Sequence, residues 1–165
     1  MKDQLATELD VTAKELLAVL SSFDKEEFNH IPAEDVWSAA QMSDHVLQSV
    51  SGFGEMLLAQ GKPADRPADE KVEELKNIFL DFSTSLKSPE FILPRGRYFE
   101  QAQIIESLKN EYEKAITAAS TVDLNEMGPM NFPQMGALSK IEMVYFITVH
   151  TKRHIHQAQK IKAAA

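Results

Sequence analysis

The stretch VYFITVHTKRHIHQAQKI, residues Val144–Ile161, has the spacing of a long helix with one apolar face. Side chains three or four residues apart share a helix face, so His150, His154 and Gln157 lie on the stripe that should face the protein interior. The β-carbons of the two histidines would be about 5–6 Å apart. His156 lies about 200° around the helix from His154 and is expected to point to solvent. The helix therefore places a pair of imidazoles in a predicted core.

A second predicted helix repeats this pattern, because its inward stripe includes Gln41, His45 and Gln48. Antiparallel packing of the two helices would bring His45 close to the pair in the last helix. Three neutral imidazoles suit a borderline divalent ion such as Zn²⁺, Ni²⁺ or Fe²⁺. Inward histidines are also common as hydrogen-bonded core residues, and the spacing of His150 and His154 also arises by chance. The spacing alone leaves metal binding and plain packing both open.

Three polar side chains flank the predicted site. Gln41 lies one turn before His45, and Gln157 lies one turn after His154, so either could line the pocket or orient a metal ligand. Glu142 lies two turns before the first histidine of the last helix, close enough to the same face to be a candidate base.

The residues around the histidines limit the other possibilities. Thr151, Lys152 and Arg153 stand where an H-E-x-x-H metalloprotease carries its glutamate, so a protease of that type is not expected. Arg153 lies beside the histidine stripe, and we expect it to pair with a carboxylate. Trp37, just before the second helix, is expected to be a packing anchor.

Amphipathic periodicity predicts helices at about residues 3–23, 38–60, 69–86, 100–120 and 139–162. Ser38 is the expected N-cap of the second helix, with Gln41 as its capping-box partner. The connections are rich in proline, glycine and polar residues, and none of them predicts a sheet. We therefore expect an all-α, four-helix bundle that forms a single domain over residues 1–165, with the 69–86 segment as an additional helix at one side.

The composition narrows the chemistry and the partners. The 165-residue chain has no cysteine, which excludes disulfides, thiolate ligands and a cysteine nucleophile, and it fits a reducing cytoplasm. Its 25 acidic and 17 basic side chains give a net charge of −8, which argues against nucleic acid as a partner. No signal peptide and no apolar run long enough to span a membrane is recognised. We expect a cytoplasmic protein that acts on a small molecule.

Two motifs resemble those of one known family. In the stretch VWSAAQMSDHVLQS, Trp-Ser opens a helix, and His45 follows eight residues after the tryptophan. The closing segment has a Pro-x-x-Gly turn at residues 133–136 and then the pattern His-x-x-Arg-His-x-x-Gln at residues 150–157. Together these motifs resemble the DinB/YfiT-like superfamily, over most of the chain in order and length.

The resemblance implies a four-helix bundle in which His45, His150 and His154 bind a divalent metal. Some members of the superfamily transfer a low-molecular-weight thiol such as bacillithiol, mycothiol or glutathione, one is a maleylpyruvate isomerase, and many have no known activity. Homodimers are common among them, so a homodimer is expected here. The resemblance does not imply DNA binding, in agreement with the charge.

The residues and the resemblance together leave three hypotheses of function. In the first, a metal-dependent enzyme of the thiol S-transferase or hydrolase type activates a thiol or water to attack a small electrophilic substrate. In the second, the domain is a non-catalytic metal- or ligand-binding stress-response module. In the third, the histidines only pack and bind no metal. Metal analysis of the purified protein separates the third hypothesis from the other two.

Overall fold

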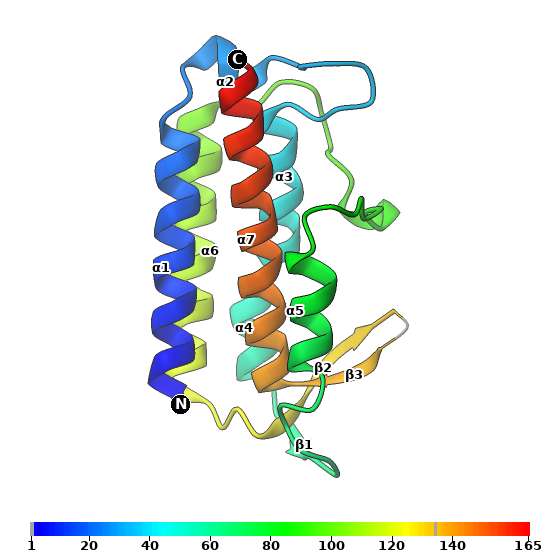
Figure 1. Ribbon diagram of the computed structural model, residues 1–165. Coiled ribbons are helices and arrows are strands. Elements are labelled where there is room, and N and C mark those ends of the chain that lie inside the picture. Colours follow the sequence, from blue (N-terminus) through cyan, green and yellow to red (C-terminus); the bar gives the residue numbers. More distant parts are fainter. Residues whose placement is uncertain (1, 134) are drawn as a thin grey trace.

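The computed structural model describes residues 2–133 and 135–165 (Figure 1). Its helices are α1 (Lys2–Ser21), α2 (Lys25–Asn29), α3 (Ala39–Val50), α4 (Phe53–Leu58), α5 (Val72–Leu80), α6 (Gln101–Thr121) and α7 (Lys140–Ala164). A 3₁₀ turn, η1, covers Glu90–Ile92. The strands are β1 (Lys62–Pro63), β2 (Glu126–Phe132) and β3 (Gly136–Ser139).

The long helices pack side by side as a bundle. α1 packs along both α6 and α7, while α3 and α4 pack on α6, and α3 also touches α7. α3 and α7 run in opposite directions (Figure 1), which is the arrangement expected to bring their histidines together. α5 lies on the outer side of α7 and packs against it, so an additional helix is present at one side, as predicted.

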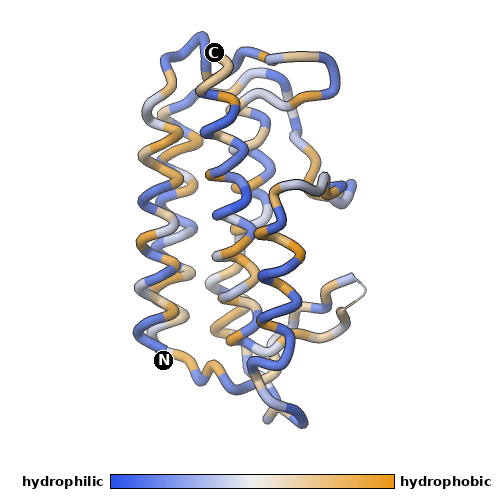
Figure 2. The backbone as a smooth tube through the Cα atoms, viewed as in Figure 1, coloured by the Kyte–Doolittle hydropathy of each residue, from blue (hydrophilic) through white to orange (hydrophobic). Residues whose placement is uncertain are grey.

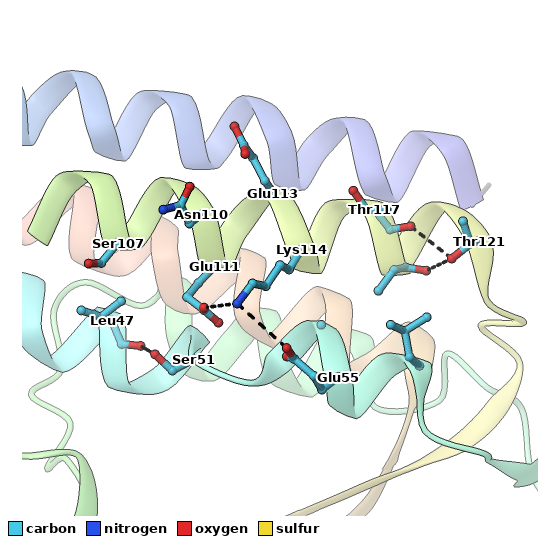
Figure 3. Close-up of a pocket in the computed structure, with 13 residues that line it drawn as sticks. Leu47, Ser51, Glu55, Ser107, Asn110, Glu111, Glu113, Lys114, Thr117 and Thr121 are labelled. Carbon is cyan, nitrogen blue, oxygen red and sulfur yellow. Dashed lines mark hydrogen bonds and ion pairs between the residues drawn. The ribbon is translucent and has the colours of Figure 1, made fainter.

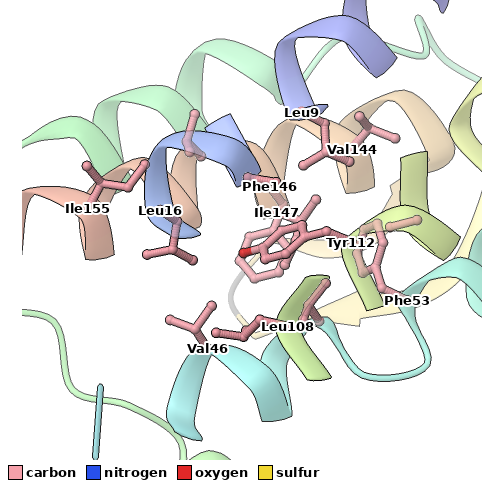
Figure 4. Close-up of a cluster of buried hydrophobic side chains, with 14 of the residues drawn as sticks. Leu9, Leu16, Val46, Phe53, Leu108, Tyr112, Val144, Phe146, Ile147 and Ile155 are labelled. Atoms are coloured by element: carbon pink, nitrogen blue, oxygen red, sulfur yellow. The ribbon is translucent and has the colours of Figure 1, made fainter. Parts of the chain in front are cut away.

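The core is built from the apolar stripes of the helices, which alternate with hydrophilic residues along each helix (Figure 2). Leu9 and Leu16 of α1, Leu108 and Tyr112 of α6 and Ile147 of α7 are almost completely buried and belong to one cluster (Figure 4). Each fully buried aliphatic side chain stabilises the fold by about 1.5–3 kcal/mol relative to an exposed one. Within the described residues, no helix combines the length and hydrophobicity needed to cross a bilayer.

The second predicted helix begins as expected and then divides. The Ser38 hydroxyl accepts a hydrogen bond from the Gln41 backbone N–H, and the Gln41 side chain accepts one from the Ser38 N–H, so the predicted capping box is present. The chain leaves the helix at Ser51 and Gly52, and Gly52 adopts a left-handed conformation with φ of 75°. Glycine adopts this conformation without a steric penalty, so α4 can start in a new direction.

A small antiparallel sheet corrects the all-α expectation. β2 lies in the middle, with β1 and β3 on its two sides, and Met127 of β2 pairs with Ser139 of β3. The sheet could not be predicted from the sequence, because Gly128 and Pro129 interrupt β2 and the strand register shifts between Met127 and Asn131. These features remove the apolar–polar alternation that identifies a strand. β3 ends at the residue that caps α7, so the sheet helps to fix where the last helix begins.

Other elements differ from the predicted ones in length. The helix expected over 69–86 is only Val72–Leu80, because Phe82 and Leu86 do not join the core and remain 40% and 41% exposed. α2 forms in a stretch predicted to be irregular. Asp24 and Glu27 form a reciprocal capping box that closes the N-terminus of this short helix.

Gly54 permits a close approach between α4 and α6. A β-carbon at this position would lie 2.9 Å from the backbone carbonyl carbon of Lys114. Because neither helix can move freely, Gly54→Ala is expected to lower the free energy of unfolding by about 1–3 kcal/mol, measured by urea unfolding. Gly96→Ala is the control, because its β-carbon would meet the Phe99 ring at an ordinary 3.5 Å. A cost at Gly54 no larger than at Gly96 would contradict this assignment.

Candidate metal centre

Three histidine rings from two helices meet inside the bundle. His45 comes from α3, and His150 and His154 come from successive turns of α7. The Nε2 atom of His150 lies 3.2 Å from Nε2 of His45 and 3.2 Å from Nε2 of His154. The three residues are 2%, 5% and 7% exposed, in chain order. The antiparallel contact between α3 and α7 therefore forms a buried imidazole cluster.

The spacing of the Nε2 atoms suits a divalent ion. Nitrogen ligands lie about 2.0–2.1 Å from Zn²⁺, so two of them at a tetrahedral angle are about 3.3–3.4 Å apart. Two of the three nitrogen pairs are 3.2 Å apart, and one potential ligand atom from each ring lies within 4.8 Å of the others. The rings are therefore already close to a coordinating arrangement.

Hydrogen bonds on the far side of two rings fix which nitrogen carries the proton. Nδ1 of His45 lies 2.8 Å from the backbone oxygen of Ile92, and a carbonyl oxygen can only accept. Nδ1 of His154 lies 2.9 Å from the side-chain oxygen of Gln157, which likewise accepts. Both Nδ1 atoms are therefore protonated in the neutral rings. Both Nε2 atoms then present lone pairs to the centre of the cluster.

His150 cannot satisfy both of these lone pairs. If its Nε2 carries the proton, it can donate to only one neighbouring ring, and the other lone pair stays unpaired. Its Nδ1 atom is buried and has no hydrogen-bond partner within the described residues. The rings of Phe79 and Phe146 flank the His150 ring, and their centroids lie 5.9 and 5.6 Å from its centroid. A cation bound to all three Nε2 atoms would use every inward lone pair, so the donor set fits a metal.

Burial keeps the three rings neutral. Desolvation lowers the pKa of His45, and the hydrogen bond to the Ile92 carbonyl opposes only part of this effect. Desolvation, followed by repulsion from the other two rings, lowers the pKa of His150 well below its usual value. Desolvation also lowers the pKa of His154 to about 3, with the His45 ring as the next cause. Neutral imidazole is the form that binds metals, so burial prepares the ligands.

The lowered pKa values predict how the stability of the metal-free protein depends on pH. The unfolded chain binds protons near pH 6.5 that the folded chain does not, so the free energy of unfolding falls as the pH drops below 6.5. For His154 this loss continues down to the folded pKa of about 3. From pH 7.5 to 5.5, the shifted pKa of His154 alone should lower the free energy of unfolding by about 1.4 kcal/mol.

Urea unfolding of chelator-treated protein at pH 7.5 and 5.5 measures this effect. His154→Gln removes one of the titrating groups and should reduce the difference between the two pH values by about 1.4 kcal/mol. Equal stability at both pH values in the parent protein would show that the buried rings are not held neutral.

The three polar side chains expected near the site take different places. Gln157 orients His154 through the hydrogen bond described above. Gln41 caps α3, and its amide nitrogen donates to the carbonyl oxygen of Gly96, 3.3 Å away. Glu142 lies at the start of α7, where it forms an ion pair with Arg66 and completes the capping box with Ser139. Its carboxylate is therefore engaged with groups outside the histidine cluster.

Other residues singled out in the sequence also find partners. The Trp37 ring packs beside His45, with centroids 5.2 Å apart, and rests against the core. Arg153 does not bind the expected carboxylate; it donates to the backbone oxygens of Phe79, Asp81 and Thr84.

His156 is half-buried rather than fully turned to solvent, because it stacks on Phe82 with a centroid distance of 4.2 Å. His30 is exposed at the C-terminal end of α2.

Two partners of the site were not predicted. Ile92 supplies the carbonyl that orients His45, and Arg95 binds the fully buried carboxylate of Asp44. The signal available in the sequence was Asp44 itself. It shares the inward stripe of α3 with Gln41 and Gln48, and a buried carboxylate requires a cationic or hydrogen-bonding partner.

A separate groove lies between α4 and α6 and has a volume of about 840 Å³ (Figure 3). Its lining includes Lys114, which forms ion pairs with Glu111 and Glu55 at 2.7 and 4.0 Å. Leu47 of α3 also lines the groove and lies about 200° around the helix from His45, on the opposite side. The groove is therefore not an entrance to the histidine cluster.

Comparisons with known proteins agree with the motifs. A family model described as the DinB superfamily matches residues 8–158. The chain is also similar to the uncharacterized protein YuaE of Bacillus subtilis (strain 168), with 23% identity over 146 residues that cover 87% of this chain and 88% of YuaE. No solved structure matches the chain. Because the family model spans most of the chain, including all three histidines, the protein belongs to the DinB superfamily.

Proposed function

We propose that this protein is a metal-dependent enzyme that activates a thiol or water for attack on a small electrophilic substrate, as a thiol S-transferase or a hydrolase does. The observation that supports it most strongly is the convergence of the Nε2 atoms of three neutral imidazole rings. In two of these rings, the hydrogen bond made by Nδ1 leaves the lone pair of Nε2 directed into the cluster. Such a set fits Zn²⁺, Ni²⁺ or Fe²⁺.

The ligand count gives the chemistry. Three protein ligands leave at least one coordination position free for another group. Three neutral ligands would also leave the full charge of a bound ion in place, so the ion would supply the charge that lowers the pKa of a water or thiol and makes it a nucleophile at neutral pH.

The surrounding residues hold the ligands and limit water. The Ile92 carbonyl and the Gln157 side chain keep Nε2 of His45 and His154 directed inward. The rings of Phe79 and Phe146 pack against His150, so its other nitrogen faces apolar groups. Such surroundings keep the local dielectric constant low, which strengthens the effect of a bound charge.

The absence of cysteine bears on the thiol reaction. Because the chain has no thiol of its own, a transferred thiol must come from a small molecule. The test is a panel of low-molecular-weight thiols and electrophiles, assayed with zinc-, nickel- and iron-loaded protein and with chelator-treated protein. Turnover that depends on both the metal and His150 would support the proposal. Metal binding without turnover across the panel would favour a non-catalytic metal- or ligand-binding module instead.

The homodimer also stays a proposal, taken from the resemblance. Light scattering coupled to size exclusion gives the mass directly, since one chain has a mass of 18.5 kDa. A mass twice that of one chain would support a dimer, and a mass equal to one chain would exclude it.

A further inference from the structure

Residues 81–99, between α5 and α6, form an irregular segment that we call the strap. Figure 1 shows it leaving the end of α5, extending outward through η1 and returning to the start of α6. No residue of the strap is fully buried. Its most exposed large apolar side chains are Phe91 and Tyr98, at 79% and 63%, while Phe99 at its end packs partly buried against the core. Hydrophobic burial therefore contributes little to its position.

Polar contacts with one face of α3 hold the strap in place. The Gln41 side chain donates to the Gly96 oxygen at 3.3 Å, and the Gln48 side chain donates to the Leu93 oxygen at 2.9 Å. Between these two, Asp44 and His45 also bind the strap. All four side chains lie on one stripe of the helix, so α3 presents a polar edge to the strap over about two turns.

The strongest of these contacts joins Asp44 to Arg95. The Asp44 carboxylate is fully buried, whereas the Arg95 side chain is 62% exposed. One carboxylate oxygen accepts from the Arg95 backbone N–H at 2.8 Å, and the guanidinium Nε–H donates to the other oxygen at 3.1 Å. Hydrogen bonds between charged groups are stronger than those between neutral groups, so this pair should contribute most to holding the strap.

The contact next to it reaches the metal centre. The Ile92 carbonyl that receives Nδ1–H of His45 is part of the strap, three residues before Arg95. At the other end of the strap, Arg153 donates to the backbone oxygens of Asp81 and Thr84. Arg153 precedes His154 in α7, so both helices that supply histidines also hold the strap.

We propose that the strap is the gate of the histidine cluster, closed by the Asp44–Arg95 pair and coupled to metal occupancy through the His45–Ile92 hydrogen bond. The inference rests on the metal-binding part of the proposed function. Opening exposes little apolar surface and exchanges polar contacts for contacts with water, so it requires far less free energy than unfolding the bundle. It would uncover the outer edge of the His45 ring.

The coupling follows from the two nitrogens of His45. An ion at Nε2 withdraws charge from the ring and makes Nδ1–H a stronger donor to Ile92. Metal binding then favours the closed strap, and by linkage the closed strap favours the bound metal.

Amide hydrogen exchange of the metal-free protein tests the gate without any metal. The strap amides are expected to exchange at least about tenfold faster than the central amides of α1 and α6. Arg95→Gln should accelerate strap exchange by about 10–100-fold, because hydrogen bonds between charged groups are lost. Arg97→Gln is the matched control, since it makes the same change at an exposed arginine of the same strap and should alter exchange by less than about twofold.

A second variant separates opening from misfolding. Gln48→Leu removes the contact with the Leu93 carbonyl and should also accelerate strap exchange, with unchanged exchange in α1. If the strap amides exchange as slowly as the amides of the bundle, the proposal that the strap is a gate is wrong. It is also wrong if Arg95→Gln and Arg97→Gln change strap exchange by the same factor.

Zinc tests the coupling. Adding Zn²⁺ should slow strap exchange by at least about tenfold more than it slows exchange in the β2–β3 hairpin. Chelator-driven zinc release should be about tenfold faster from Arg95→Gln than from Arg97→Gln. Uniform protection of the chain, or equal release rates, would overturn the coupling. If zinc does not bind at all, the proposed function fails, while the metal-free exchange still decides whether the strap opens.

Discussion

Replacing His150 by glutamine is expected to reduce bound zinc from about one ion per chain to less than about a tenth after dialysis against a weak chelator. His150 lies between the other two rings, and its Nε2 is 3.2 Å from each of theirs. A structural zinc site with four ligands has an apparent binding free energy of about 10–16 kcal/mol, so one ligand accounts for about 2.5–4 kcal/mol. Its loss should weaken affinity by about 10²–10³-fold.

The matched control for this prediction is His156→Gln. His156 lies on the same helix but stacks on Phe82, outside the histidine cluster, so its replacement should leave the zinc content unchanged. Metal analysis and the zinc-dependent rise in the melting temperature measure both variants. If zinc content is unchanged when His45 and His150 are both replaced by alanine, the site assignment is wrong.

Replacing Glu142 by glutamine is expected to lower the free energy of unfolding by about 3–5 kcal/mol. The carboxylate is fully buried, and both of its oxygens bind the Arg66 guanidinium, at 2.6 and 2.7 Å. The backbone N–H groups of Lys71 and Ser139 each donate to it at 2.9 Å. Burial raises the pKa of Glu142, but these hydrogen bonds outweigh burial and hold the pKa below its usual value.

An amide cannot satisfy these four donors, because its NH₂ group would face N–H groups and leave some unpaired. Glu113→Gln, on the exposed face of α6, is the control and should change stability by less than about 0.5 kcal/mol. Urea unfolding of both variants measures the difference. A Glu142→Gln variant with full stability but reduced turnover would instead assign Glu142 to the reaction as a base.

The sequence predicted those parts of the structure that depend on periodic side chains. The apolar stripes located the long helices, and Ser38 and Gln41 located the start of α3. The same periodicity placed the three histidines on inward faces, where the structure brings them together. These features are local, because residues within a few positions of each other determine them.

The features that the sequence did not reveal depend on distant or backbone groups. The Ile92 carbonyl that orients His45 is a group that every residue carries, so no residue type marks it. Arg66 and Glu142 are 76 positions apart, and neither residue has a local pattern that indicates the pair. Gly128 and Pro129 interrupt the alternation of β2, so its pairing emerges only when β1 and β3 lie beside it.

The most direct test of the metal centre is X-ray absorption at the zinc edge of the zinc-loaded protein. We predict one zinc ion per chain with three nitrogen ligands at about 2.0–2.1 Å and the scattering pattern of imidazole rings. In His150→Gln, the ion or at least one imidazole should be lost. A chain that binds no zinc, or a bound zinc whose spectrum lacks imidazole scattering, would contradict a metal centre formed by His45, His150 and His154.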